Sequence, residues 1–188
     1  MTLHGTIILA LYFLFGMLFF AVLFRIRQQG RELFGRPTMN VFVQMTGKLA
    51  LFVPVLVLPA AAYGINLSWF RPDPWMVWVA VATSFVAIIY LSLSVLQMGK
   101  YTKMGLPHKD EIELQTRGIY SLSRNPMYFG LFLLAIASVL YVPNPLNLLA
   151  AIVGIIVHHL IILNEERFLA STFQARWFEY KSRVRRYL

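Results

Sequence analysis

Two polar stretches of this chain lie directly beside apolar runs and carry residue types that can bind a ligand. The first, SRNPMYFG, puts an arginine, an asparagine and a proline at the mouth of an apolar run. One interpretation is a plain helix start, in which Ser123 or Asn125 caps the helix and Pro126 occupies its first turn. The other is that the exposed helix start, together with Arg124 and Tyr128, forms half of a ligand site.

The second stretch is an acidic pair, Glu165 and Glu166, at the end of another apolar run. The helix dipole disfavours carboxylates at a helix C-terminus, so a compensating positive charge is expected. Either Arg167 or the basic C-terminal segment supplies that charge at a solvated helix end, or a cationic ligand does. Because successive helical positions differ by about 100°, one carboxylate can face the bundle while the other meets water or a basic side chain.

Two adjacent histidines precede the acidic pair, so that His158 shares a helix face with Glu165 and His159 shares one with Glu166. An imidazole inside a membrane helix is either a neutral group hydrogen-bonded between helices or a catalytic or substrate-polarising residue. No HExxH or HxxxH spacing exists, and we predict no metal site. Without cysteine, the chain has no thiolate nucleophile and no disulfide framework.

The elements that must position these residues are membrane helices. Of the 188 residues 59% are hydrophobic, and the mean hydropathy of +0.65 is far above that of soluble domains. A bilayer is spanned by about 20 residues, and the apolar residues form five runs, at 3–24, 41–63, 74–98, 127–142 and 146–163. We predict an all-α integral membrane protein with about five transmembrane helices, of which the last two are short.

An amphipathic helix is predicted after Glu166, on the cytoplasmic side. Its apolar stripe has spacings of three and four residues and consists of Leu169, Phe173, Trp177, Tyr180 and Val184. The basic residues of this segment fall mostly off the stripe. The helix is expected either to anchor the chain to the membrane surface or to act as a lid over the site.

The net charge of +9 is segregated along the chain. Almost all of the basic residues lie on alternate connections, at 25–36, 100–124 and 167–186. The positive-inside rule then places the N-terminus outside and the C-terminus in the cytoplasm, which requires an odd number of helices. We expect a multi-pass protein of a prokaryotic inner membrane. Membrane topology and anionic lipid explain the basic excess, so no nucleic-acid partner is predicted.

Polarity also divides the chain into two parts of one structural domain. Residues 1–98 are interpreted as a three-helix scaffold. Residues 99–188 are interpreted as a cofactor-binding half that contains a helical hairpin at 127–163. The tight turn Pro143-Asn144-Pro145 makes the two hairpin helices antiparallel neighbours. The RNPMY stretch is therefore expected to lie close to residues 164–166.

Several motifs of the second half, in this order and spacing, resemble the isoprenylcysteine carboxyl methyltransferase family and its phospholipid methyltransferase relatives. They are Leu114, Gly118 and Tyr120, then the RNPxYxG pattern from Arg124 to Gly130, then Glu165-Glu166-x-x-Leu169, with MGKYTKMG before them and VRRYL after them. The resemblance covers roughly residues 95–188. The chain departs from the pattern at Asn125, where many members have histidine.

The resemblance implies an enzyme that uses S-adenosyl-L-methionine at the cytoplasmic membrane face without a Rossmann fold. By that resemblance Arg124, Asn125, Pro126 and Tyr128 would line the cofactor pocket. Gly118 and Tyr120 would lie on the approach to it, and Glu165 and Glu166 would close it. The cofactor's adenine, ammonium, carboxylate and sulfonium suit aromatic rings, acidic acceptors and a helix N-terminus beside an arginine.

The methyl acceptor is expected to carry a hydrocarbon tail and to enter from the lipid. A carboxylate acceptor needs no general base, whereas an amine or thiol must lose a proton, which Glu165, Glu166 or His159 could accept. Two alternatives remain: an NADPH-dependent membrane reductase of the steroid reductase type, and a non-enzymatic membrane scaffold. The absence of GxGxxG and P-loop patterns disfavours nucleotide-fold and phosphoryl-transfer enzymes.

Overall fold

The described part of the chain is entirely helical in its regular structure. The computed structural model describes residues 2–28, 37, 39–98 and 113–188. Its elements are α1 (Leu3–Gln28), α2 (Val41–Tyr63), α3 (Pro74–Met98), the 3₁₀-helix η3 (Gly118–Ser121), α4 (Pro126–Tyr141), α5 (Pro145–Phe173) and α6 (Ala175–Arg183). Helices α1, α2, α3 and α5 are long and apolar enough to cross a membrane, and α4 is a shorter apolar helix. The predicted all-α membrane fold is confirmed.

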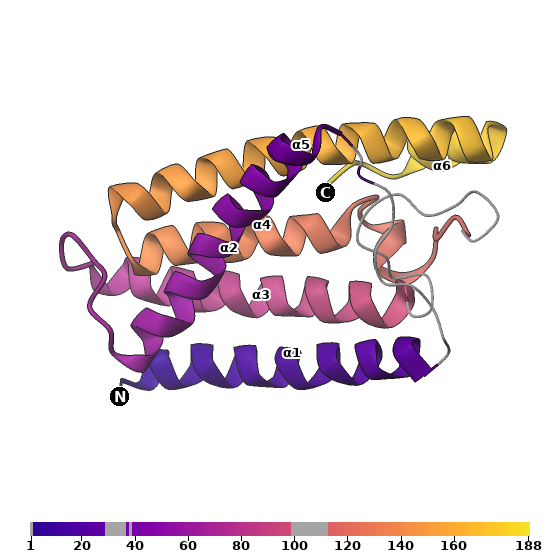
Figure 1. The fold of residues 1–188 in the computed structure, drawn as a ribbon. Coiled ribbons are helices and arrows are strands. Elements are labelled where there is room, and N and C mark those ends of the chain that lie inside the picture. Colours follow the sequence, from indigo (N-terminus) through magenta and orange to yellow (C-terminus); the bar gives the residue numbers. More distant parts are fainter. Residues whose placement is uncertain (1, 29–36, 38, 99–112) are drawn as a thin grey trace.

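The long helices form a bundle in which α2 crosses the others obliquely (Figure 1). Helix α3 packs mainly against α4, and α2 packs mainly against α5, so both halves of the chain share one interior. The N-terminus, the connection from α2 to α3 and the turn from α4 to α5 lie at one end of the bundle. The C-terminal segment and α6 lie towards the other end, where α4 begins.

Glycines allow α2 and α5 to approach closely. A Cβ atom on Gly154 would lie 2.8 Å from the backbone N and Cα of Leu51, and one on Gly47 would collide with the side chain of Val157. Small residues at such crossings are typical of membrane helices, which gain stability from close backbone packing rather than from burial against water. This contact therefore fixes where α5, with its histidines and acidic pair, lies against the scaffold.

The outer surface of the bundle is apolar over most of its length. Helix α1 buries Ile8 completely, whereas Phe13, Phe20 and Phe24 are each more than 60% exposed. In water such a surface would be unfavourable, but lipid tails are as apolar as these side chains. The exposed side of α1 is thus suited to face the bilayer.

The end of the chain differs from the prediction in two respects. The fifth helix was expected to be short, but α5 continues without a break through the acidic pair to Phe173. The predicted amphipathic helix is interrupted at Gln174, whose φ of 44° is a left-handed conformation, and only α6 follows it as a separate helix. The spacing of the apolar stripe continues across this break. Periodicity alone therefore could not predict the break, because a single residue of unusual φ does not change the spacing.

Some predicted features fall outside the described residues. They include most of the MGKYTKMG motif and five basic residues of the 25–36 and 100–124 connections: Arg31, Arg36, Lys100, Lys103 and Lys109.

Candidate active site

The start of α4 is held in place by the segment before it. Gly118 has a φ of 60°, and its lack of a side chain makes room for the side chain of Gln97 at the end of α3. The Oε1 atom of Gln97 accepts a hydrogen bond of 2.8 Å from the backbone N–H of Ile119. The 3₁₀-helix η3 is therefore fixed to α3. Ser123 and Arg124 lie between η3 and the first turn of α4, so this contact also fixes their position.

Helix α4 begins as the sequence suggests, but without the predicted side-chain cap. Pro126 occupies the first turn and Asn125 the N-cap position, but the Asn125 side chain makes no capping hydrogen bond. The Ser123 hydroxyl oxygen accepts a hydrogen bond of 3.2 Å from the Asn125 backbone N–H, outside the first turn. The amide of Asn125 instead donates to Glu166 Oε1 at 3.1 Å. The capping interpretation is thus wrong for Asn125, because its side chain faces a carboxylate rather than its own helix.

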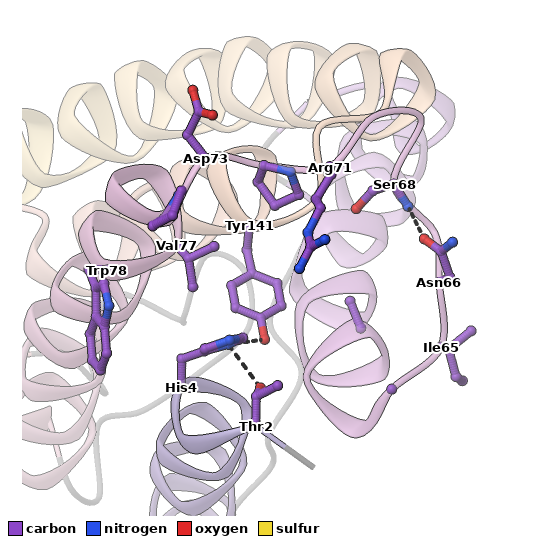
Figure 2. Close-up of a pocket in the computed structure, with 14 residues that line it drawn as sticks. Thr2, His4, Ile65, Asn66, Ser68, Arg71, Asp73, Val77, Trp78 and Tyr141 are labelled. Atoms are coloured by element: carbon purple, nitrogen blue, oxygen red, sulfur yellow. Dashed lines mark hydrogen bonds between the residues drawn. The ribbon is translucent and has the colours of Figure 1, made fainter.

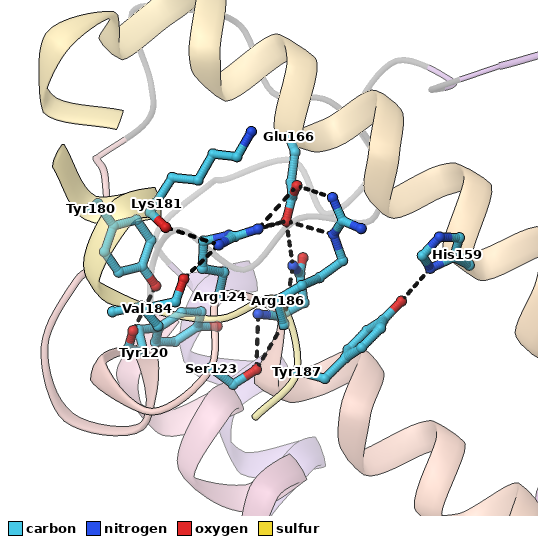
Figure 3. A network of polar contacts seen from close by, with 11 residues as sticks. Tyr120, Ser123, Arg124, His159, Glu166, Tyr180, Lys181, Val184, Arg186 and Tyr187 are labelled. Carbon is cyan, nitrogen blue, oxygen red and sulfur yellow. Dashed lines mark hydrogen bonds and ion pairs between the residues drawn. The ribbon is translucent and has the colours of Figure 1, made fainter. Parts of the chain in front are cut away.

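Glu166 is the centre of a buried ionic network (Figure 3). Its carboxylate lies 3.2 Å from Arg124 Nη2 and 2.8 Å from Arg186 Nη2, and its side chain is only 8% exposed. Together with the amide of Asn125, these groups satisfy both carboxylate oxygens. Glu166 therefore joins α5 to the start of α4 and to the C-terminal segment.

Arg124 is held on all sides by protein. Its guanidinium also donates to the backbone oxygens of Lys181, in the last turn of α6, and Val184, directly after it. The ring of Trp177 lies 5.8 Å from its Cζ atom, a cation–π distance. Because four directional N–H groups are engaged in this way, a lysine could not replace this arginine without loss of contacts.

The C-terminal segment lies directly beside the RNPMY stretch. The backbone N–H of Arg124 donates to the carbonyl of Arg185 at 3.0 Å, and that of Asn125 donates to the carbonyl of Arg186 at 3.2 Å. The hydroxyl of Ser123 also donates to Arg186 O. The hydrogen bond to Glu166 raises the pKa of the Arg186 guanidinium, which keeps it charged. Residues 123–125 and 184–186 thus form one paired unit.

Glu165 points to a different part of the bundle. One of its oxygens accepts a hydrogen bond of 2.9 Å from the Tyr128 hydroxyl. Among the described residues, its other oxygen has no hydrogen-bond partner. On the preceding turns His158 places Nδ1 2.8 Å from the carbonyl of Gly154, and its ring lies beside that of Tyr128. Glu165 is therefore the carboxylate of the pair that can still accept a hydrogen bond from a ligand.

His159 belongs to a third contact, on the Glu166 side of α5. Its Nδ1 atom lies 2.6 Å from the hydroxyl of Tyr187. The Tyr187 ring also lies against Phe129 and Phe132 of α4. The terminal segment therefore connects α4 and α5 through an aromatic side chain as well as through Arg186.

Helix α6 covers this end of the bundle. The apolar stripe does not lie open to the membrane, since Trp177 and Tyr180 are at least 97% buried in a cluster with Leu114. The Tyr180 hydroxyl donates to the carbonyl of Tyr120 at 2.6 Å, and burial raises the pKa of that phenol, so it remains neutral. Of the two predicted roles, this packing favours the cover over the surface anchor, and the role itself stays a prediction.

The predicted proximity of the RNPMY stretch to the acidic pair is confirmed by these contacts. The solvated helix end is wrong for Glu166, which is buried. The basic C-terminal segment does supply a compensating charge, through Arg186, whereas Arg167 donates to Asn164 instead. Gly118, Tyr120 and Pro126 lie on the backbone that carries Arg124, not in the ionic network.

Sequence reasoning missed the partners at the C-terminus. Arg186 and Tyr187 were noted only as part of the VRRYL motif, and Ser123 only as a possible cap. No local pattern indicates that these residues return to the junction. Of the described residues, no group of three or more acidic or histidine side chains could hold a metal ion.

The donors and acceptors at this end fit a compact ligand that carries both charges. The uncapped start of α4 offers backbone N–H groups to an anion. The free oxygen of Glu165 offers an acceptor to an ammonium or hydroxyl group, and Tyr128 and His158 place aromatic surface beside it. S-adenosylmethionine has such groups, and these residues fit it.

Comparison with known proteins gives two matches. The phospholipid methyltransferase family matches residues 75–176, which is more than half of the chain and includes α4 and both glutamates. Protein-S-isoprenylcysteine O-methyltransferase of Saccharomyces cerevisiae is 29% identical over 133 residues, an alignment that covers 62% of this chain and 54% of the yeast protein. The chain thus spans about half the length of this curated relative. No solved structure matches this chain.

Proposed function

The chain belongs to the phospholipid methyltransferase family, and from this premise we propose that it is an S-adenosylmethionine-dependent membrane methyltransferase acting on a lipid-like acceptor. The observation that carries the proposal is the junction at Glu166. Three sequence-distant segments, the start of α4, the end of α5 and the C-terminal segment, meet there through buried charges. An ionic junction of this kind is costly to bury, so a role beyond holding helices together is reasonable.

We assign two kinds of role to the site residues. Glu165 and Tyr128 would contact the cofactor, because one Glu165 oxygen keeps its hydrogen-bonding capacity. Asn125 and Pro126 would line the pocket at the first turn of α4, whose N–H groups beyond Pro126 have no side-chain cap. Arg124 and Glu166 would act as positioning residues that hold this surface in shape. Gly118 and Tyr120 would set the approach by fixing the segment before α4.

The cofactor supplies an already activated methyl group when bound, so the protein mainly has to align the acceptor and exclude water. Helix α6 and the terminal segment are placed to exclude water, since Trp177, Tyr180 and Tyr187 cover the junction. For a carboxylate acceptor no further group is required. For an amine or thiol acceptor, Glu165 or His159 would accept the proton.

The proposal includes an orientation and a substrate class. We infer from the basic connections and the positive-inside rule that the Glu166 end of the bundle faces the cytoplasm, and we propose a prokaryotic inner membrane as its location. The yeast relative is by its name a methyltransferase of S-isoprenylcysteine, an acceptor with a long hydrocarbon chain. The apolar exposed helices suit an acceptor that arrives through the lipid, whether it presents a carboxylate, an amine or a thiol.

Calorimetry with the purified protein tests the function. We expect S-adenosylhomocysteine to bind and NADPH not to bind. Glu165→Gln should weaken that binding by roughly 10- to 150-fold, the equivalent of a charge-assisted hydrogen bond of about 1.5–3 kcal/mol. Glu179→Gln is the matched control, because Glu179 lies in an exposed pair with Arg183. Binding of NADPH alone would indicate the reductase, and binding of neither would indicate a scaffold; both contradict the proposal.

A further inference from the structure

A polar cavity lies at the end of the bundle opposite to Glu166 (Figure 2). Its volume is about 680 Å³, and it is lined by the start of α1, the end of α2, the connection to α3 and Tyr141. Helix α4 separates it from the candidate active site by 16 residues, about 24 Å along the axis. A group bound in this cavity could not reach the acidic pair, so the cavity is a different site.

The walls of the cavity are held in place by contacts between segments. The His4 Nδ1 atom lies 2.8 Å from the Tyr141 hydroxyl, which joins the start of α1 to the end of α4. The connection between α2 and α3 is bound to the next turn, since Trp69 N–H donates to the Pro143 carbonyl and Asn144 donates to the Leu67 carbonyl. The cavity is therefore a preformed feature of the fold.

Hydrogen-bond donors collect on one wall. Arg71 forms no ion pair or hydrogen bond with any described residue, and in Figure 2 its guanidinium points towards Tyr141. Ser68 and Asn66 line the same wall. The Asn66 oxygen accepts from the Ser68 backbone N–H, and its NH₂ group, which points away from Arg71 in Figure 2, is left without a partner among the described residues. A guanidinium, an amide and a hydroxyl are the groups that bind phosphate oxygens in proteins.

The surroundings restrict the charge and the source of such a phosphate. Asp73 is exposed on the rim and points away from Arg71, so the wall has one positive and one negative charge. A singly charged phosphodiester suits this balance better than a doubly charged free phosphate. Trp69, Trp75 and Trp78 are exposed around the same end, and exposed tryptophans mark the headgroup level of a bilayer.

We propose that this cavity binds the phosphodiester headgroup of a membrane phospholipid, with Arg71 as its main contact. The bound lipid is separate from the methyl acceptor, because it lies at the other end of α4. Its headgroup would join α1, α4 and the α2–α3 connection from the water side, so it would stabilise the bundle at the end that the Glu166 network does not reach.

Fluorescence titration tests this site without any methyl transfer. The chain has no cysteine, so Ile65→Cys, at an exposed position on the cavity wall, can carry a single environment-sensitive dye. Three probes are compared in uncharged detergent: dihexanoyl phosphatidylglycerol, inorganic phosphate and uncharged dihexanoylglycerol. We expect a saturable response to the phospholipid, a response to inorganic phosphate that is at least about 10-fold weaker, and none to the diacylglycerol.

Two variants decide whether Arg71 is responsible. Arg71→Gln should weaken the phospholipid response by about 10-fold or more, because a charge-assisted contact is lost. Arg25→Gln is the control, since Arg25 is an exposed arginine at the far end of α1. Equal affinity of Arg71→Gln and the unsubstituted protein would overturn the proposal. Equal responses to phosphatidylglycerol and dihexanoylglycerol would also overturn it, and a phosphate response as strong as that of the lipid would assign the site to free anions instead.

Discussion

The two adjacent glutamates lie in different surroundings, from which we proposed different tasks, and no property of the residue type predicts this difference. Glu166 is enclosed by two guanidiniums and an amide, whereas Glu165 has one tyrosine. A helix separates adjacent side chains by about 100°, so the pair necessarily divides between two neighbourhoods. Which neighbourhood each would meet depended on the path of the C-terminal segment. That path is a tertiary feature, so the sequence left the assignment open.

Separate tests of stability and binding distinguish these tasks. Glu166→Gln should lower the free energy of unfolding by about 1–3 kcal/mol, because two guanidiniums lose their counter-charge and one of them is buried. Glu165→Gln should change it by less than about 0.5 kcal/mol, because an amide oxygen still accepts from Tyr128. Thermal melts of both variants without ligand measure this difference. Equal melting temperatures for the two variants would contradict the division of roles.

At the scale of elements, the sequence predicted helices well and their ends poorly. Runs of apolar residues correctly indicated α2 and α3, whose bounds coincide with the predicted ones. The run that ends before Asn164 did not, because α5 continues through polar residues that the ionic network stabilises. The break at Gln174 and the missing cap at Asn125 were also not predicted. At Asn125 a contact with a distant segment, the carboxylate of Glu166, decides the side-chain conformation, whereas the backbone hydrogen bonds of Gln174 with described residues are all with neighbouring turns.

The contact between α2 and α5 gives a prediction at this scale. Gly154→Ala should lower the free energy of unfolding by about 1–3 kcal/mol, because the new methyl group meets the backbone of Leu51, which cannot move aside as a side chain would. Gly16→Ala is the control, since nothing lies within 4 Å of the added atom. Alanine in that exposed helix should be neutral or stabilise by up to about 1 kcal/mol. Chemical denaturation in detergent, followed by circular dichroism, compares the two. A loss of stability in Gly16→Ala as large as that in Gly154→Ala would contradict close packing as the cause.

At the scale of the whole molecule, composition was enough for the fold class but not for the site. A chain that is 59% hydrophobic, with its polar residues in a few clusters, has to form membrane helices. The tight turn between α4 and α5 makes the two helices antiparallel neighbours, so the start of α4 lies beside the later part of α5. For this reason the RNPMY stretch was correctly placed beside the acidic pair. The return of residues 184–188 onto that junction follows from no local pattern.

Membrane topology now depends on one helix, α4. Four helices of full length give an even number of crossings, and only a crossing by α4 puts the termini on opposite sides. At 16 residues α4 is about 24 Å long, shorter than a hydrocarbon core of about 30 Å. Its ends, however, are covered by protein. Buried Tyr141 lies at one end, and the paired segments 123–125 and 184–186 lie at the other. A short helix shielded in this way can cross without exposing its polar ends to lipid.

Labelling of single cysteines in intact cells tests this topology against a background free of native cysteine. An impermeant maleimide should label cysteine at Thr2 or Ser68 from outside. Cysteine at Gln28, Gln115 or Ser182 should react only after the membrane is permeabilised, because these positions follow an odd number of crossings. Ser182 is the decisive position, since it lies beyond α5. If α4 did not cross, α6 would lie outside, and cysteine at Ser182 would be labelled in intact cells while cysteine at Gln115 stayed protected. That outcome would separate the Glu166 network from the cytoplasm and exclude a cytoplasmic supply of cofactor.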